Sequence, residues 1–117
     1  MRAARFLKAA YCHCSDCRRI TGAPVAAFGA YGTVQIVPPV APKSFVAGVE
    51  RWACPACGSA LAATYDYLPD QTYVPLGILD NPPAPQMHCH AESAVAWLHI
   101  DDDLPRHGAS GRGALTG

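Results

Sequence analysis

Short apolar segments separated by proline and glycine dominate the hydrophobic pattern of this chain of 117 residues. Residues 24–31, 33–37 and 72–79 are rich in valine, tyrosine, phenylalanine and other apolar side chains, which is typical of β-strands. In the second segment Val34 and Ile36 alternate with polar or turn-forming residues, which predicts a half-buried strand. The pattern therefore predicts a mainly β domain of short, mostly antiparallel strands.

Eleven prolines and ten glycines argue against long helices, because proline breaks a helix interior and glycine weakens it. One short helix is predicted from Ser15 to Thr21. Ser15 or Asp16 is expected near its start and Gly22 at its end, since these residue types favour helix caps.

The chain length suits one domain with its own core. We expect a single folded zinc-binding domain over residues 1–106. The remaining segment, residues 107–117, is rich in glycine and has little to bury, so a disordered tail is expected there.

Charge and hydropathy narrow the possible partners. Nine basic and nine acidic side chains give a formal net charge of zero, and Arg18-Arg19 is too small a cluster for a nucleic-acid surface. No window holds about 18 consecutive apolar residues, so no membrane span is expected. Lys8 interrupts the apolar run near the N-terminus, which argues against a signal peptide and favours a cytoplasmic protein.

Five of the six cysteines lie in two tight clusters, which favours metal binding or catalysis over disulfides. Cys12, Cys14 and Cys17 form a C-x-C-x-x-C motif of soft ligands that suit zinc. Three thiolates can occupy three corners of a tetrahedron and leave the fourth open to water or substrate, as in catalytic zinc sites. The alternative is one closed structural site shared with Cys54 and Cys57.

The second cluster, C-P-x-C-G over residues 54–58, is typical of a metal-binding knuckle in which Gly58 supplies a positive φ. Two ligands do not complete a site, and the candidates to complete it are the first cluster, His88, Cys89 and His90. In an extended strand Cys89 would face away from both histidines. We therefore favour an ordinary strand with one buried small residue at this segment.

The residues around the first cluster allow further hypotheses. His13 alternates with the cysteines, so its side chain is expected to point away from them. Arg18 and Arg19 could favour thiolates or hold an anionic substrate group, or could form a solvated pair at the helix end. An iron–sulfur cluster would need four cysteines at a different spacing.

Four motifs resemble one known family. Residues 12–24 resemble the C-H-C-x-x-C-R-x-x-x-G hallmark of the glutathione-dependent formaldehyde-activating enzyme family, which includes centromere protein V. Residues 48–61 are similar to its second zinc motif, 76–82 to its G-x-L-D-x-P turn, and 88–97 to its terminal segment. The resemblance covers about residues 9–106, with the motifs in the family's order.

This resemblance implies a β-tent of antiparallel sheets pinned by zinc. It implies a catalytic zinc on Cys12, Cys14 and Cys17, and a structural zinc held by an earlier C-x-C pair together with Cys54 and Cys57. The implied activity is that of a carbon–sulfur lyase on adducts of a thiol and an aldehyde, such as S-hydroxymethylglutathione formed from glutathione and formaldehyde. The alternative is a non-catalytic zinc-binding module or scaffold of the same fold.

The sequence departs from the family at two points. No cysteine precedes Cys12, so the earlier C-x-C hairpin has no counterpart, and we expect either a longer native chain or a member without the hairpin. Cys54 and Cys57 then need other partners, and an exposed sheet edge would favour a homo-oligomer. Cys89 stands where the family usually has an aliphatic residue, which favours a packing role. Arg18, Arg19 or Arg51 could receive a carboxylate of the thiol substrate.

Overall fold

A seven-stranded mixed β-sheet forms the body of the protein in the computed structural model, which describes residues 2–3, 5–111, 113 and 115. The strand order is β5-β6-β7-β8-β3-β2-β9, and neighbouring strands are antiparallel except for β2 and β9, which are parallel. The strands of this sheet are β2 (Phe6–Cys12), β3 (Ala26–Tyr31), β5 (Lys43–Val46), β6 (Val49–Ala53), β7 (Ala60–Tyr65), β8 (Thr72–Pro75) and β9 (His88–Cys89). A small second sheet pairs β1 (Arg2–Ala3) with β4 (Val34–Gln35). The expected mainly β fold is confirmed.

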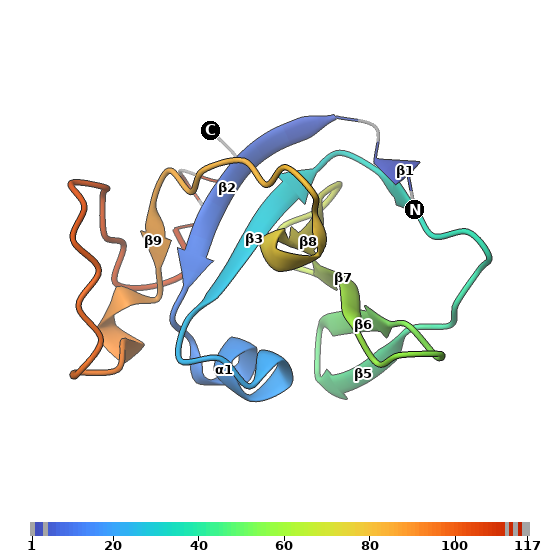
Figure 1. Ribbon diagram of the computed structural model, residues 1–117, viewed down its shortest axis with the longest axis horizontal. Coiled ribbons are helices and arrows are strands. Elements are labelled where there is room, and N and C mark those ends of the chain that lie inside the picture. Colours follow the sequence, from blue (N-terminus) through green and yellow to red (C-terminus); the bar gives the residue numbers. More distant parts are fainter. Residues whose placement is uncertain (1, 4, 112, 114, 116–117) are drawn as a thin grey trace.

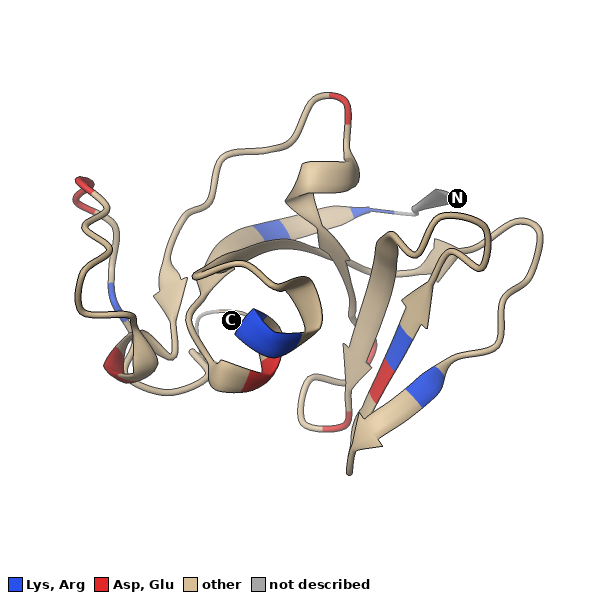
Figure 2. Cartoon of the chain, turned by 60° about the horizontal axis from the view of Figure 1, so that its bottom comes forward, with Lys and Arg blue, Asp and Glu red and all other residues tan. Residues whose placement is uncertain are grey.

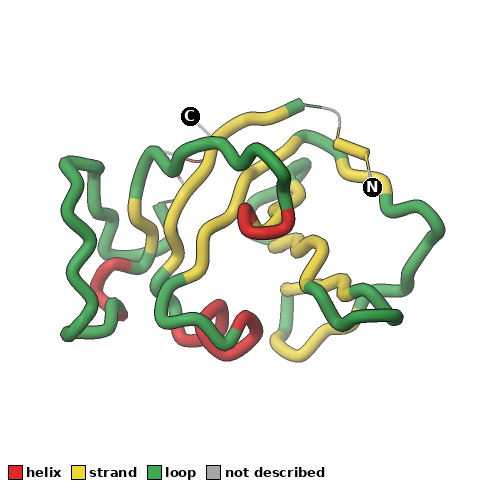
Figure 3. The backbone as a smooth tube through the Cα atoms, in the orientation of Figure 1, coloured by secondary structure: helices red, strands yellow, loops and turns green. Residues whose placement is uncertain are grey.

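The sheet bends so strongly that it forms two arms, as Figure 1 shows. The long strands β2 and β3 run through one arm, while β5, β6 and β7 form the other. The two arms meet where β7 pairs with β8 at Ala63 and Tyr73. Helix α1 (Ser15–Thr21) lies at the ends of β2 and β3, across from β5 and β6 (Figure 3). Two 3-10 turns, η1 (Leu76–Ile78) and η2 (Ala91–Ser93), follow β8 and β9 respectively.

Small residues let the strands of the first arm pack closely. Ala30 of β3 is fully buried, and Phe28 of the same strand is 6% exposed. Between them, a Cβ atom on Gly29 would lie 3.0 Å from the ring of Tyr31 and 3.3 Å from the side chain of Leu76. Glycine is therefore needed at this position because a larger residue would force those neighbours apart.

The predicted helix is confirmed, with Ser15 and Asp16 in its first turn, and the residue that caps it is Cys14. The Cys14 side chain accepts a hydrogen bond from the backbone N–H of Cys17, as an N-cap residue does. Gly22 ends the helix in the left-handed conformation at φ 72°, and its N–H donates to the Arg18 carbonyl over 2.8 Å.

The boundaries of the predicted strands differ from the observed ones. The predicted strand 72–79 ends at Pro75, where the chain turns into η1. The half-buried strand 33–37 is reduced to the two residues of β4. The sequence reading missed β2 altogether, although it is the longest strand and lies between β3 and β9.

Part of the C-terminal segment packs against the sheet. The His107 N–H donates to the His88 carbonyl over 2.8 Å, and Leu115 is only 6% exposed within the hydrophobic core. Residues 112, 114, 116 and 117 lie outside the described residues, and the domain boundary near residue 107 stays a prediction. Within the described chain, no helix is long and apolar enough to cross a membrane.

Candidate metal centre

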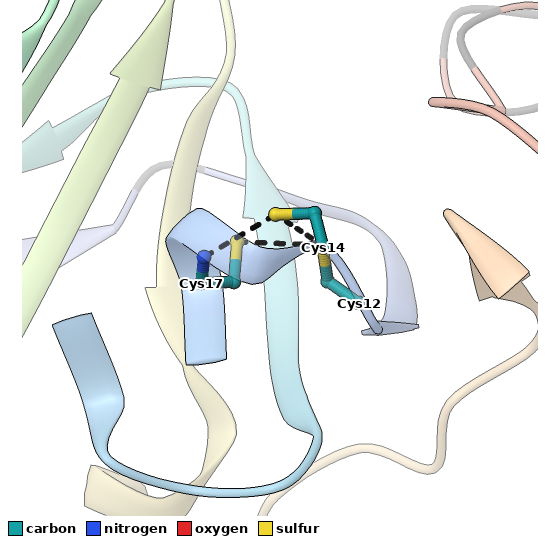
Figure 4. A group of neighbouring side chains, drawn as sticks. All are labelled: Cys12, Cys14 and Cys17. Atoms are coloured by element: carbon teal, nitrogen blue, oxygen red, sulfur yellow. Dashed lines mark hydrogen bonds between the residues drawn. The ribbon is translucent and has the colours of Figure 1, made fainter. Parts of the chain in front are cut away.

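The junction between β2 and α1 brings three cysteines together. Cys12 is the last residue of β2, Cys14 caps α1 in an extended conformation, and Cys17 lies in the first turn of the helix. The capping geometry turns the chain back on itself, so all three side chains converge (Figure 4). Cys17 is 2% exposed and belongs to the core, which fixes the helix against the sheet.

The spacing of the three sulfur atoms suits a metal ion. The Cys12 Sγ lies 3.5 Å from the Cys14 Sγ and 3.3 Å from the Cys17 Sγ. All three sulfurs lie within 4.8 Å of one another. Thiolates at the usual zinc–sulfur distance would be about 3.8 Å apart around a tetrahedron. Shifts of a few tenths of an ångström would therefore let these residues hold a metal ion.

Hydrogen bonding makes the three thiols electrostatically unequal. The Cys12 thiol, followed by the Cys17 thiol and backbone N–H, lowers the pKa of Cys14 by stabilising its thiolate. The pKa of Cys12 is raised, first by its hydrogen bonds with the other two thiols and then by burial. In this cluster the thiolate form of Cys14 is stabilised, whereas Cys12 tends to keep its proton. A cation would displace the remaining protons as it binds.

A hollow of about 50 Å³ adjoins the sulfur atoms. Besides the three cysteines, its wall includes Tyr65, Tyr67, Cys89, His90 and Leu115. Burial raises the pKa of Tyr65, and burial together with the charge of the cysteines raises the pKa of Tyr67 to about 12. Both phenols are protonated at neutral pH and can serve as hydrogen-bond donors. The hollow is therefore small and largely apolar, with phenol groups in its wall.

A chain of hydrogen bonds runs through the buried side chains of His13 and His88. The sequence did not predict it. The His13 Nε2 lies 2.8 Å from the His88 Nδ1, and the His88 Nε2 lies 2.9 Å from an Asp102 carboxylate oxygen. Arg106 donates to the other Asp102 oxygen over 2.7 Å, and the Tyr11 ring stacks on His88 with centroids 4.7 Å apart. This confirms that His13 points away from the cysteines. Both ring nitrogens of His88 are occupied by hydrogen bonds, one to His13 and one to Asp102.

The segment at Cys89 is a strand, as expected, but it buries more than one small residue. His88 is 1% exposed and Cys89 is 4% exposed, and β9 ends there because His90 adopts a left-handed conformation at φ 53°. Cys89 packs in the core, and burial raises the pKa of its thiol to about 11. Its backbone pairs with that of Cys12, which brings Cys89 to the wall of the hollow.

An ion pair ties α1 to the second arm of the sheet. The Arg51 guanidinium, on β6, lies 2.7 Å from the Asp16 carboxylate, and the Arg51 side chain is 9% exposed. Arg51 also lies over the Tyr65 ring at 5.8 Å from its centroid. Both contacts give Arg51 a structural role. Of the other two arginines proposed to receive substrate, Arg19 is exposed and Arg18 is half-buried.

We predict that Asp16→Asn lowers the free energy of unfolding by about 1–3 kcal/mol, because it leaves a buried guanidinium without its counter-charge. Asp80, which is exposed, provides the matched control Asp80→Asn, with an expected change within about 0.5 kcal/mol. Urea unfolding followed by circular dichroism measures both variants. Equal stability of the two would show that the ion pair does not anchor α1.

The second cysteine pair lies apart from the first cluster. Cys54 lines a separate groove of about 460 Å³ that also includes Ile20, Lys43 and Phe45. Among the described residues, the group of three or more potential ligands within 4.8 Å of one another is Cys12, Cys14 and Cys17. The structure therefore does not bring Cys54 and Cys57 into one closed site with the first cluster.

The fold and the site together define a class of protein, namely small mainly β domains with a three-thiol centre able to hold a metal ion. The family model described as glutathione-dependent formaldehyde-activating enzyme matches residues 2–93. The chain belongs to this family, which confirms the resemblance seen in its motifs. No curated protein matches the chain in sequence.

Proposed function

We propose that the protein is a zinc-dependent carbon–sulfur lyase-type enzyme acting on adducts of a thiol and a small aldehyde, such as S-hydroxymethylglutathione. The observation that carries the proposal is the convergence of three thiols beside a hollow lined by tyrosines. Cys12, Cys14 and Cys17 would hold the zinc. Family membership supports glutathione and formaldehyde as the reacting pair.

Zinc bound to three protein ligands supplies Lewis-acid polarisation of an oxygen or stabilisation of a thiolate. The chain itself would provide the surroundings. The wall of the hollow is largely apolar, which strengthens electrostatic contacts beside the sulfurs. Tyr65 and Tyr67 keep their protons at neutral pH, so they can donate a hydrogen bond to an oxygen of the adduct.

The alternative, a zinc-binding module without turnover, would be favoured by a fourth protein ligand that closes the site. Within the part of the chain that the structure describes, the group of possible ligands contains three residues and no fourth. This favours the enzyme. The proposal includes a reducing, cytoplasmic setting because all six cysteines are free and thiol clusters persist where reductants keep them reduced.

We predict that zinc-loaded protein accelerates the exchange between glutathione and formaldehyde and their adduct by at least about 10-fold over the uncatalysed rate. Exchange spectroscopy by NMR on the equilibrium mixture measures this rate directly. Cys54→Ser/Cys57→Ser is the control and should keep the activity, since these residues lie outside the three-thiol group. Exchange at the uncatalysed rate with one zinc on the first cluster would refute the proposed activity.

A further inference from the structure

The backbone between two of the three thiols is held by the side chain of His13. This residue separates Cys12 from Cys14, and it is 5% exposed. Its backbone N–H donates to the Cys89 carbonyl over 3.0 Å. Its ring points away from the thiols, with the Nε2 atom 2.8 Å from the His88 Nδ1, and the two rings stack with their centroids 5.1 Å apart. The contacts of one side chain therefore fix the midpoint of the segment that carries Cys12 and Cys14.

Asp102 sets the direction of these hydrogen bonds. The hydrogen bond with His88 lowers the pKa of Asp102 to about 2, so the group is a carboxylate and can only accept. The His88 Nε2, 2.9 Å away, therefore carries a proton. With both imidazoles neutral, the His88 Nδ1 is then an acceptor, and the His13 Nε2–H donates to it. The orientation of the His13 ring thus depends on a carboxylate far along the chain.

Stability alone does not explain a histidine at position 13. Its second ring nitrogen, Nδ1, is buried and has no hydrogen-bond partner among the described residues. A buried polar atom without a partner destabilises a fold, and an apolar ring would avoid that cost. An imidazole provides what an apolar ring cannot, namely a directed contact that fixes the orientation of the ring. The backbone that benefits from this contact carries Cys12 and Cys14.

The outer end of the hydrogen-bond chain lies in the segment after η2. Asp102 lies outside the part of the chain that the family model matches. Figure 2 shows the segment beside β9 at one end of the molecule, with acidic positions in red and basic positions in blue. The His88 N–H donates to the Pro105 carbonyl, and the His107 N–H donates to the His88 carbonyl, both over 2.8 Å. The C-terminal segment is therefore connected to the three-thiol centre by continuous contacts.

We propose that His88 and Asp102 are positioning residues for the three-thiol centre. They hold the His13 ring, and through it the backbone between Cys12 and Cys14, so that the thiols converge before a metal binds. Ligands that are already in place lose less freedom on binding, which raises the metal affinity. This inference rests on the proposed zinc site of the first cluster, and it adds a control of zinc affinity by the C-terminal segment.

The zinc affinity of Asp102→Ala tests this role. The variant removes the acceptor for His88 and leaves all three thiols in place, and we expect its zinc dissociation constant to rise about 10-fold. Asp102→Asn should raise it by less than about 3-fold, because the amide oxygen can still accept from the His88 Nε2–H. The variants are made in a Cys54→Ser/Cys57→Ser background, so that binding reports on the first cluster. Competition with a chromophoric chelator, with zinc chloride as the sole added metal, measures each affinity.

His13→Phe breaks the hydrogen-bond chain at its inner end. Phenylalanine keeps an aromatic ring against His88 but cannot donate to it, so the same rise of about 10-fold is expected. The double variant His13→Phe/Asp102→Ala should bind zinc no more weakly than either single variant, because both changes interrupt one chain of contacts. Circular dichroism confirms that every variant is folded.

Val74→Ala controls for a general loss of stability. Val74, on β8, is 1% exposed and lies outside the hydrophobic cluster that contains the cysteines. Its truncation destabilises the fold by leaving a cavity. The zinc dissociation constant of the folded variant should nevertheless stay within about 2-fold of wild type, since the segment around His13 is unchanged.

Two results would overturn the positioning role. One is wild-type zinc affinity in Asp102→Ala, and the other is an equal loss of affinity in Asp102→Ala and Val74→Ala. Equal zinc affinity of the background protein with and without Cys14→Ser would overturn the zinc site and the positioning role together. If the affinities follow the expected order but exchange between glutathione and formaldehyde stays at the uncatalysed rate, the enzyme is refuted and the positioning role is supported.

Discussion

Replacing Cys14 with serine is expected to remove tight zinc binding from the first cluster while leaving α1 in place. The Cys14 side chain has two roles, since it caps the helix and belongs to the three-thiol group. A serine hydroxyl caps a helix at least as well but does not replace a thiolate on zinc. We expect the zinc affinity of this cluster to fall by more than about 100-fold. The stability of the metal-free protein should change by less than about 0.5 kcal/mol.

Cys14→Ala separates the two roles. It removes the cap as well as the thiol, so metal-free Cys14→Ala should be about 1 kcal/mol less stable than metal-free Cys14→Ser. Competition with a chromophoric chelator measures the zinc affinity, and urea unfolding measures the stability. Wild-type affinity in Cys14→Ser would show that the metal does not bind to this cluster. Equal stability of the two variants would show that the cap contributes nothing.

The second large effect is expected at His88. His88→Ala should lower the free energy of unfolding by about 3 kcal/mol or more, because it opens a cavity, leaves the buried His13 Nε2 without its partner and removes the contact with Asp102. It also removes the stacking contact with Tyr11. Urea unfolding of the metal-free protein measures this change without a contribution from zinc.

His99→Ala is the matched control, since His99 is exposed, and its stability should change by less than about 0.5 kcal/mol. The stability of Asp102→Asn should lie between those of His88→Ala and His99→Ala. An amide keeps the shape of the side chain but loses the charge that faces His88 and Arg106. If His88→Ala were as stable as His99→Ala, the buried hydrogen-bond chain would not hold the C-terminal segment to the sheet.

Local chemistry explains what the sequence could predict. The helix 15–21 and its end at Gly22 follow from capping preferences and glycine conformation, which depend on neighbouring residues alone. The convergence of the three cysteines has the same origin, since they lie within six consecutive residues. The outward direction of His13 followed from simple alternation along an extended segment.

Long-range contacts explain what the sequence could not predict. Strand β2 was missed because Lys8 and two alanines weaken its apolar pattern, and its burial depends on partners far along the chain. The chain of hydrogen bonds from His13 through His88 to Asp102 joins residues up to 89 positions apart, and no local pattern links them. The pair of Asp16 and Arg51 is hidden in the same way, since each residue alone resembles an ordinary surface charge.

The pairing of β9 with β2 also means that the hollow is completed late in synthesis. The three thiols of the first cluster emerge within six residues, whereas Cys89 and Leu115 in the wall of the hollow are synthesised more than 70 residues later. Contacts between near neighbours need little loop closure and can form early in a nascent chain. Metal can therefore reach the thiols on the ribosome before the wall exists. The supply of metal at that moment, as well as the final affinity, would then set how much of the finished protein is loaded.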